Sequence, residues 1–417
     1  MTDDATPPDY LPEPRPTSDK VAEREAALQE LAGQSAPAVP PGAASVLTDR
    51  VLLHTSWDTG SKLLPVLPEH VGGLVLRGAG AATGIKHLSK AGFDRPIAYD
   101  PEGYAVAAAT EDDPFVLRPA DGGLFGLTLE QELQRQRDFK ACVALTPTGY
   151  LHAGDSDALR AAVRAAGGID DDDVVFSVPL DVGWFQPEHI DHLIAVLALL
   201  ELPKAVFIGG HFDPLERYKD AVANLRRLVA EAGHVAVLRT DLTGFDVMSH
   251  GAFATSIGSG GSLRHMNPLG QIRRSKKDDK SPSVLFGDLM SFFKGSTLYE
   301  KFADSQAPVC DCASCDGREL NTFLTKDDSI PAHRHGLCTW ADWIPGLHAC
   351  RTLADRATWW RTQCVDAVAN AEIVNTRINQ PEAFKPPETL RAWAELPSWL
   401  SAIHPVTRRP RAPRQSP

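Results

Sequence analysis

The sequence predicts an α/β protein, a (β/α)8 TIM barrel followed by a C-terminal zinc-binding helical segment. Eight short, apolar, β-rich runs alternate with segments of helical periodicity between residues 51 and 258. This is the pattern of a parallel sheet covered by helices, and eight repeats suit a closed barrel. After residue 300 the alternation of strand and helix patterns stops, and three cysteines lie close together in VCDCASC at 309–315. A doubly wound open sheet is the alternative fold.

The 417-residue chain divides into four predicted parts. Residues 1–46 are rich in proline and have little apolar periodicity, apart from a short helical stretch at 20–33, so they predict a mobile leader. Residues 47–300 form the barrel. Residues 301–380 form the zinc-binding segment, with a long Trp-rich helix at 352–375 that packs on the barrel. Residues 381–417 are an extension with a basic tail.

Each predicted strand is a continuous apolar run, as expected for strands buried on both faces. The runs are VLLHTS (51–56), GGLVLR (72–77), PIAYD (96–100), ACVALTPT (141–148), VVFSVPLD (174–181), AVFIGG (205–210), VAVLRTD (235–241) and FATSIG (253–258). Amphipathic stretches at 157–168, 187–202 and 217–233 are plausible crossover helices.

A barrel of this type carries its active site where the strands end and the following loops begin. The residues at those ends are Asp100, Thr146–Thr148, Asp181, Gly209–Asp213, Asp241 and Ser256–Arg264. Among them, the Gly-rich loop 258–265 with Arg264 is equally well explained as a phosphate cradle or as a plain connector.

Composition restricts the expected cellular location and the expected binding partners of the protein. The net charge is −12, so the overall field does not attract nucleic acid, and any such contact must be local. Two basic stretches, 273–280 and 407–415, are better explained as a solvated loop and a solvated end. The longest apolar run has ten residues and the N-terminus lacks the features of a signal peptide, which predicts a cytoplasmic protein without a membrane span.

The three clustered cysteines, Cys310, Cys312 and Cys315, predict a structural zinc site, because Cys-x-Cys-x-x-Cys offers three thiolates to one tetrahedral ion. The candidates for the fourth ligand are His333, His335, Cys338, His348 and Cys350. We expect His348, at the start of the Trp-rich helix, with Cys338 and His335 as the next candidates. His333 and His335 lie in PAHRHG, which reads as a loop. The other two cysteines considered, Cys142 and Cys364, are expected to be small core residues.

The Cys-x-Cys-x-x-Cys knuckle at 310–315 and a distant histidine at the start of a helix, placed after a barrel, resemble the tRNA-guanine transglycosylase superfamily. This superfamily includes the archaeosine enzymes and bacterial relatives that insert 7-deazaguanines into DNA. IAYDPEGY at 97–104 is similar to the strand that carries Asp-Ser-Gly-Gly-Phe in that family. AVFIGGHFDPLERY at 205–218 resembles its Gly-Gly strand, and FATSIGSGGSLRH at 253–265 lies where its last strand ends in an Arg-containing loop. The resemblance covers about residues 50–380.

The resemblance implies roles for individual residues. Asp100 corresponds to an aspartate that handles protons or binds the base. The substrate-binding positions implied or suggested by these motifs are Gly103, Tyr104, Gly209, Gly210, Ser256 and Arg264. The partners implied are tRNA or DNA, a guanine or 7-deazaguanine base, and either a second copy or a catalytic partner subunit. Zinc is the implied cofactor.

The chain departs from the family at the nucleophile. In the family an aspartate on the last strand attacks the ribose C1′, whereas here Ser256, or its neighbour Ala254 or Thr255, takes that position. Thr146 or Thr148 replaces the base-reading aspartate after strand four. If the chain is an enzyme, Asp181, Asp241 or Asp246 must supply the missing carboxylate.

Three functions therefore remain open from the sequence. The first is a transglycosylase-like enzyme that uses Asp100 with Asp181 or Asp241. The second is a non-catalytic accessory or nucleic-acid-binding subunit of the same superfamily. The third is a barrel enzyme of unrelated chemistry, in which zinc is only a clasp. The placement of carboxylates at the strand ends distinguishes the first two.

Overall fold

The computed structural model describes residues 18–117, 126–271 and 279–401. Eight parallel strands form one sheet in the order β3-β2-β1-β8-β7-β6-β5-β4. They are β1 (Arg50–Ser56), β2 (Leu74–Arg77), β3 (Ile97–Asp100), β4 (Ala144–Leu145), β5 (Val174–Asp181), β6 (Lys204–Gly209), β7 (Val235–Thr240) and β8 (Ala254–Gly258). The two ends of this sheet meet, because the backbone N–H of Cys142, just before β4, donates to the carbonyl of Ile97 in β3 at 2.8 Å. The closed barrel is thus confirmed, and the open sheet is not.

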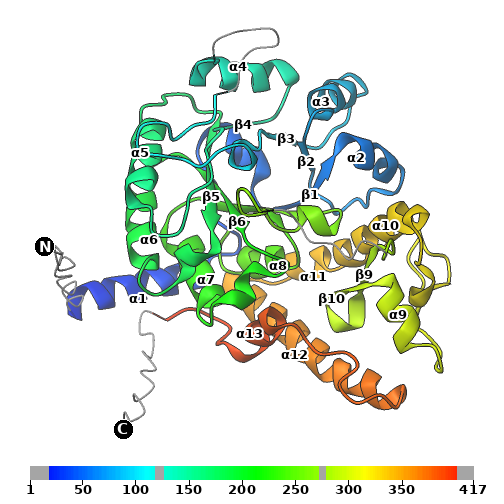
Figure 1. The fold of residues 1–417 in the computed structure, drawn as a ribbon. Helices are drawn as coiled ribbons and strands as arrows, with labels where there is room; N and C mark the ends of the chain where they lie inside the picture. Colours follow the sequence, from blue (N-terminus) through cyan, green and yellow to red (C-terminus); the bar gives the residue numbers. More distant parts are fainter. Residues whose placement is uncertain (1–17, 118–125, 272–278, 402–417) are drawn as a thin grey trace, which may run out of the picture.

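Helices surround the sheet, as Figure 1 shows. Those that follow the strands are α2 (Trp57–Leu63), α3 (Ala81–Lys90), α4 (Leu129–Phe139), α5 (Ser156–Gly167), α6 (Ile190–Ala198), α7 (Ala221–Glu231) and α8 (Thr243–Ser249). Local signals start several of them: Thr128 and Gln131 form a capping box at α4, and the Asp155 side chain caps α5. Such caps satisfy backbone N–H groups that have no partner within the helix.

The side chains of each strand alternate between two cores. Leu52, Val75, Ala98, Ala236 and other inward residues fill the barrel interior. The residues between them, such as Val51, Leu74 and Val237, pack outward against the helices. This alternation follows from the two-residue period of a strand, and it decides below which polar side chains enter the barrel mouth.

The segment before the barrel differs from the prediction of a mobile leader. Residues 18–47 contain α1 (Ser18–Gly33) and the short helix η1 (Gly42–Leu47). Leu28 of α1 is 2% exposed, and its carbonyl accepts a hydrogen bond from Trp399 Nε1 at 3.1 Å. Leu47 joins the interior core of the barrel. Burial of these few apolar residues fixes a segment whose average composition suggested mobility.

The C-terminal part begins with two hairpins and continues with helices. Its elements are β9 (Ser283–Phe286), β10 (Ser291–Lys294), α9 (Gly295–Lys301), β11 (Val309–Cys310), β12 (Arg318–Glu319), α10 (Ser329–Ala341), α11 (Ile344–His348), α12 (Leu353–Arg377) and α13 (Glu388–Glu395). The guanidinium of Arg334 on α10 donates to the carbonyl of Lys62 on α2 at 2.8 and 3.2 Å. Trp360 of α12 is fully buried and stacks on Phe245 of α8. The long helix therefore packs on the barrel, as predicted.

Two further sequence predictions concern the surface. Most of the basic stretch 273–280 and all of the tail 407–415 lie outside the described residues. Within the described ranges, none of the helices combines the length and apolar character needed to cross a membrane.

Candidate metal centre and barrel mouth

The three clustered cysteines lie on a tight knuckle between β11 and β12. The backbone N–H groups of Cys315 and Asp316 donate to the carbonyl of Cys312 at 2.9 and 3.1 Å, and that of Gly317 donates to the carbonyl of Cys310 at 3.0 Å. Asp316 and Gly317 have positive φ values of 48° and 82°, which reverse the chain within two residues. The turn brings the three thiols to one side of the knuckle.

His335 on α10 completes the cluster. The donor atoms of Cys310, Cys312, Cys315 and His335 all lie within 4.8 Å of one another. His335 Nδ1 lies 3.2 Å from Cys310 Sγ and 3.4 Å from Cys315 Sγ. Its other ring nitrogen, Nε2, lies 2.7 Å from the carbonyl of Leu285 on β9. A carbonyl only accepts, so Nε2 carries the proton and Nδ1 is left with a lone pair directed at the sulfurs.

This donor set fits a tetrahedral metal ion. With Zn–S bonds of about 2.3 Å and Zn–N bonds of about 2.0 Å, sulfur and nitrogen ligands of one tetrahedral zinc are separated by about 3.5 Å, close to the observed distances from His335 Nδ1. Three thiolates and one imidazole form a Cys₃His set, which is typical of structural zinc. The cluster therefore supports a metal site of the predicted type.

The predicted fourth ligand, His348, is wrong. His348 ends the short helix α11 and lies beside Asp49, with 3.7 Å between its Nε2 and Asp49 Oδ1. Asp49 immediately precedes β1, so this contact is at the amino-terminal end of that strand. The error came from reading PAHRHG as a loop, whereas it lies within α10. Pro331 occupies the first turn of α10, where its missing N–H costs no hydrogen bond.

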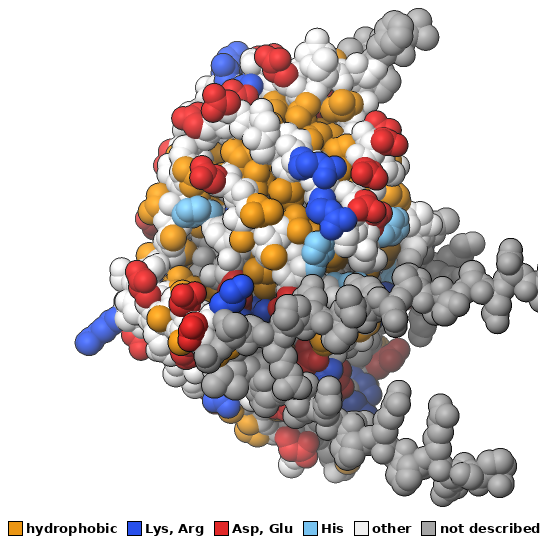
Figure 2. Space-filling model, turned by 90° about the vertical axis from the view of Figure 1, so that its left-hand side faces the viewer, with side chains coloured by type: hydrophobic (Ala, Val, Ile, Leu, Met, Phe, Trp, Pro, Cys, Tyr) orange, Lys and Arg blue, Asp and Glu red, His pale blue; other side chains and the backbone are white. Residues whose placement is uncertain are grey.

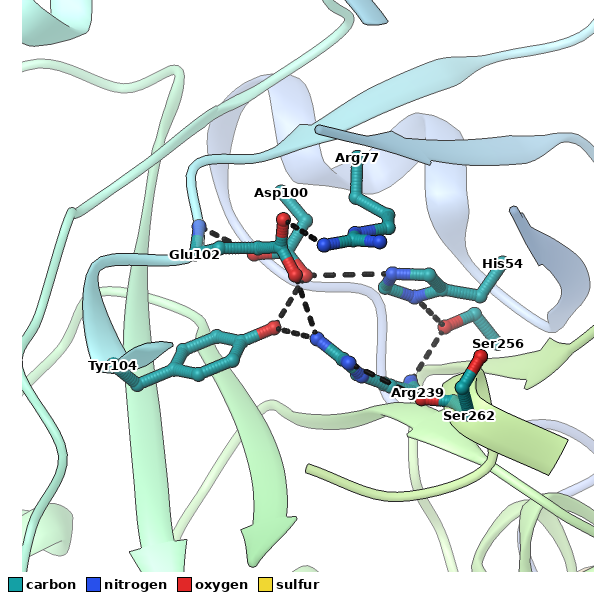
Figure 3. Close-up of polar contacts among 8 residues, drawn as sticks. All are labelled: His54, Arg77, Asp100, Glu102, Tyr104, Arg239, Ser256 and Ser262. Carbon is teal, nitrogen blue, oxygen red and sulfur yellow. Dashed lines mark hydrogen bonds and ion pairs between the residues drawn. The ribbon is translucent and has the colours of Figure 1, made fainter. Parts of the chain in front are cut away.

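At the opposite end of β1, the barrel mouth holds a buried polar network (Figure 3). Both oxygens of Asp100 are engaged: Oδ1 accepts from the backbone N–H of Glu102 at 2.9 Å, and Oδ2 accepts from the hydroxyl of Tyr104 at 2.5 Å. His54 Nε2 lies 3.4 Å from the same Oδ2. Asp100 is only 1% exposed. The predicted catalytic aspartate is thus at the mouth, but its carboxylate is occupied by the protein itself.

Strand alternation explains why these side chains meet. His54, Arg77, Asp100 and Ser256 each follow by two positions an apolar residue that faces the barrel interior. They form the uppermost inward layer of β1, β2, β3 and β8.

Arg239 reaches the mouth through a local irregularity. On β7 the inward residues are Ala236 and Leu238, so regular alternation would turn Arg239 outward. Instead Arg239 has a left-handed backbone with φ 58°, and the β7–β8 register shifts between Val237 and Thr240. Bulges of this kind redirect a side chain and are common near functional sites.

The ionic groups of the mouth neutralise one another. Arg239 Nη1 donates to Glu102 Oε1 at 2.9 Å and to the Tyr104 hydroxyl at 2.8 Å. Arg77 Nη2 lies 2.7 Å from Glu102 Oε2. Two guanidinium groups therefore balance the carboxylates of Glu102 and Asp100 in a site where Arg239 is 7% and Glu102 8% exposed. Buried charges persist in this way when each has a partner.

Ser256, His54 and Asp100 lie in a row of close polar contacts: a hydrogen bond joins Ser256 to His54, and a longer ion-pair contact joins His54 to Asp100. The Ser256 hydroxyl oxygen accepts from the backbone N–H of Arg239 at 2.8 Å and lies 3.2 Å from His54 Nδ1. This pattern assigns the proton of neutral His54 to Nε2, which faces Asp100, and lets Ser256 donate to Nδ1. The connectivity matches that of a serine nucleophile with its base. However, Ser256 and His54 are 0% exposed, so a substrate has no access to the hydroxyl. The contacts among these three side chains are therefore structural.

Burial sets the protonation of these side chains. Desolvation lowers the pKa of His54, outweighing the attraction of Asp100, with Arg239 adding to the decrease. Burial alone would raise the pKa of Asp100, but His54, Arg239 and the Tyr104 hydroxyl together hold it below its usual value. Neutral His54 beside ionised Asp100 is the state at neutral pH.

Acidification should destabilise the fold through His54. An unfolded histidine binds a proton near pH 6.5, whereas folded His54 resists protonation, so the unfolded state binds more protons below that pH. The contribution of neutral His54 to stability is fully present above pH 6.5 and is lost as the pH falls toward the lowered pKa of His54 in the folded state. Urea unfolding midpoints at about pH 7.5, 6.0 and 5.0 measure this loss of stability. The same decline in His54→Gln would show that another group is responsible.

The other two predicted catalytic carboxylates lie outside this network. Asp181, at the end of β5, accepts from the Tyr150 hydroxyl at 2.7 Å and from the backbone N–H of Gly183 at 2.8 Å. Asp241 follows β7 and accepts from the backbone N–H and the hydroxyl of Thr243, the first residue of α8, at 2.8 and 2.7 Å. Asp246, the remaining candidate, is fully buried against Arg226, with Oδ1 2.6 Å from Nη2. Asp246 is therefore a structural ion-pair partner.

The predicted substrate-binding glycines have packing roles. A Cβ on Gly103 would meet the carbonyl oxygen of Pro147 at 2.4 Å, and one on Gly209 would meet the Tyr150 ring at 2.8 Å. At Gly210 a Cβ would lie 2.7 Å from Pro214 Cβ. These close approaches leave no room for a side chain.

Arg264 is directed away from the network around Asp100. Its guanidinium lies 3.2 Å from the centre of the Phe292 ring on β10, and its Nη1 donates to the hydroxyl of Ser283 on β9 at 3.0 Å. It thus joins the loop after β8 to the first C-terminal hairpin. Thr146 and Thr148, one of which the resemblance would place at the base-reading position, hydrogen-bond to each other at 2.8 Å between their hydroxyl oxygens and are buried.

Four residues of the mouth were missed in the sequence: His54, Arg77, Glu102 and Arg239. A signal was present for His54 and Arg77, since each is a polar residue near the end of an apolar strand and in phase with the inward positions. Arg239 is out of phase, so no periodic pattern could reveal it.

Comparisons of the chain with protein-family models and with curated proteins give no match.

Proposed function

We propose that this chain is a zinc-containing, transglycosylase-like barrel protein that acts as a non-catalytic subunit in the modification of guanine-type bases in tRNA or DNA. Strand β8 carries the proposal. In the family that the sequence resembles, the nucleophilic carboxylate stands on the last strand, and here Ser256, or its neighbour Ala254 or Thr255, takes that position. All three are buried, and Ser256 is bonded within the protein. A buried hydroxyl cannot trap a sugar C1′.

The state of Asp100 supports the same conclusion. A group that shuttles protons to a base must reach that base. The carboxylate of Asp100 instead accepts from Glu102 and Tyr104 and is 1% exposed. A substrate would have to break these contacts before using it.

The distribution of charge favours a subunit over an independent nucleic-acid binder. The net charge is −12. Figure 2 shows the face on the left of Figure 1, where Lys and Arg side chains lie in small separated groups among acidic and apolar ones. Because tight binding to a phosphate backbone needs several cations tracking it, we assign the substrate-holding role to a catalytic partner subunit.

Base exchange tests the proposal. We expect the purified chain to incorporate no labelled guanine into tRNA or into duplex DNA, with an active tRNA-guanine transglycosylase as the positive control. Asp100→Asn should behave as the unmutated protein. Incorporation by the unmutated chain that disappears in Asp100→Asn would overturn the non-catalytic assignment.

One observation favours the enzymatic alternative. Asp213, after β6, and Asp241, after β7, belong to neighbouring strand ends. Burial, together with the negative charges of Asp241 and Glu216, raises the pKa of Asp213 to about 7. A carboxylic acid whose pKa lies near neutral pH, with a second carboxyl group at the neighbouring strand end, is suited to acid–base cleavage of a glycosidic bond.

This alternative predicts that guanine exchange or release, if measured, depends on Asp213. Asp213→Asn should then abolish it, while Asp181→Asn should retain it because Asp181 is held separately by Tyr150. Turnover that is unchanged in Asp213→Asn would eliminate this pair as the acid–base equipment.

A further inference from the structure

The Gly-rich loop after β8 is tied to the C-terminal part of the protein by Arg264. Arg264 Nη1 donates to the hydroxyl of Ser283, the first residue of β9, at 3.0 Å, and its guanidinium lies over the Phe292 ring of β10. In the same loop, the carbonyl of Ser262 accepts a hydrogen bond from Arg239 Nη2 at 3.2 Å (Figure 3). The loop therefore contacts the β9–β10 hairpin on one side and the polar network of the barrel mouth on the other.

The same hairpin also contacts the metal cluster. His335 Nε2 donates to the carbonyl of Leu285 on β9 at 2.7 Å, while His335 Nδ1 faces the sulfurs of Cys310 and Cys315. Leu285 lies two residues after Ser283 on one strand, a separation of about 7 Å. A single short strand thus makes one contact with the metal cluster and another with the loop after β8.

Helix α10 provides a second connection between the metal cluster and the barrel. His333 packs on the loop after β8, since a Cβ on Gly260 would lie 2.9 Å from His333 Nε2. The next residue, Arg334, donates to the carbonyl of Lys62 on α2. The residue after that, His335, completes the donor set of the cluster. Because these three side chains come from one turn of the helix, a movement of α10 displaces all three contacts together.

We propose that α10 and the β9–β10 hairpin couple the metal cluster to the barrel mouth, so that loss of the metal ion loosens the loop after β8. Strands β11 and β12 of the knuckle contain two residues each, which is too short for a hairpin that is stable by itself. Metal binding therefore supplies much of the free energy that orders the knuckle and holds α10 against it. Without the metal, His333 and Arg264 no longer fix the loop, and the carbonyl that Ser262 offers to Arg239 moves with it.

Hydrogen exchange measured by mass spectrometry tests this coupling on the full-length chain, with zinc bound and after zinc removal by a strong chelator. We expect the backbone amides of residues 260–264 to exchange about tenfold faster without zinc, a typical size for coupling between two sites. The segment Val182–Phe185 after β5, three strands away from β8, is the internal control and should be unchanged. Because the readout is amide exchange, the outcome does not depend on the proposed role in base modification.

Arg264→Met removes the hydrogen bond to Ser283 and the cation over Phe292. We expect the loop of this variant to exchange faster with zinc bound and to respond less to zinc removal. Because coupling between two sites is reciprocal, the variant should also bind zinc more weakly, by up to about tenfold. Arg377→Met, at an exposed position in the last turn of α12, is the matched control and should behave as the unmutated chain.

Equal exchange of residues 260–264 with and without zinc would overturn the proposal. An equal acceleration at Val182–Phe185 would also overturn it, because the whole barrel would then loosen and no specific connection would be needed. The comparison in the unmutated chain requires no variant, so it decides the question even if Arg264→Met does not fold.

Discussion

His335→Ala should purify without zinc, whereas His348→Ala should retain about one zinc per chain. The first change removes the nitrogen that lies 3.2 and 3.4 Å from two of the cluster's sulfurs. The second removes a histidine that contacts Asp49 instead. The metal-binding free energy of such sites is on the order of 10 kcal/mol and is available only to the folded segment. We therefore expect His335→Ala to lower the stability of the protein more than any other single substitution.

Metal analysis and thermal unfolding measure this effect together. In His335→Ala, the C-terminal part should melt before the barrel, since Cys310 and Cys315 pack against the same apolar cluster as Phe286 and Phe384. Addition of a strong chelator to the unmutated chain should reproduce that behaviour. Equal zinc contents in the two variants would show that a different residue completes the site.

Arg239→Met should lower the free energy of unfolding by about 3 kcal/mol or more. The change keeps much of the side-chain volume but removes the cation that bonds Glu102 and Tyr104. Arg77 remains for Glu102, while the negative charge of Asp100 loses the nearby Arg239. A buried carboxylate without compensation is costly.

Denaturant unfolding provides the measurement, with Arg217→Met as the control. Arg217 is an exposed residue on the loop after β6, so the same chemical change there should cost no more than about 0.5 kcal/mol. Similar losses in both variants would mean that the mouth network adds nothing beyond ordinary surface interactions.

The fold was largely predictable because a barrel repeats one simple signal. Each strand is a short apolar run buried on both faces, and all eight predicted runs overlap the observed strands. The same period of two also places His54, Arg77, Asp100 and Ser256 in one inward layer. What it could not place was Arg239, because one left-handed residue and a register shift reverse the direction of its side chain.

The metal site shows a second limit of sequence reasoning. Three of the four clustered donors were evident because their spacing lies within one knuckle. The fourth depends on how a helix packs over that knuckle, which spacing along the chain does not encode. His335 is positioned by the carbonyl of Leu285, 50 residues away in the sequence, and PAHRHG contains both a proline and a glycine although it lies within α10.

Zinc-edge X-ray absorption of the purified protein tests the central claim most directly, namely that Cys310, Cys312, Cys315 and His335 hold one structural zinc. We predict about three sulfur ligands near 2.3 Å and one imidazole nitrogen near 2.0 Å, with the imidazole signal lost in His335→Ala. A shell of four sulfurs, which would bring Cys338 into the site, or a shell made only of oxygen and nitrogen, would contradict it.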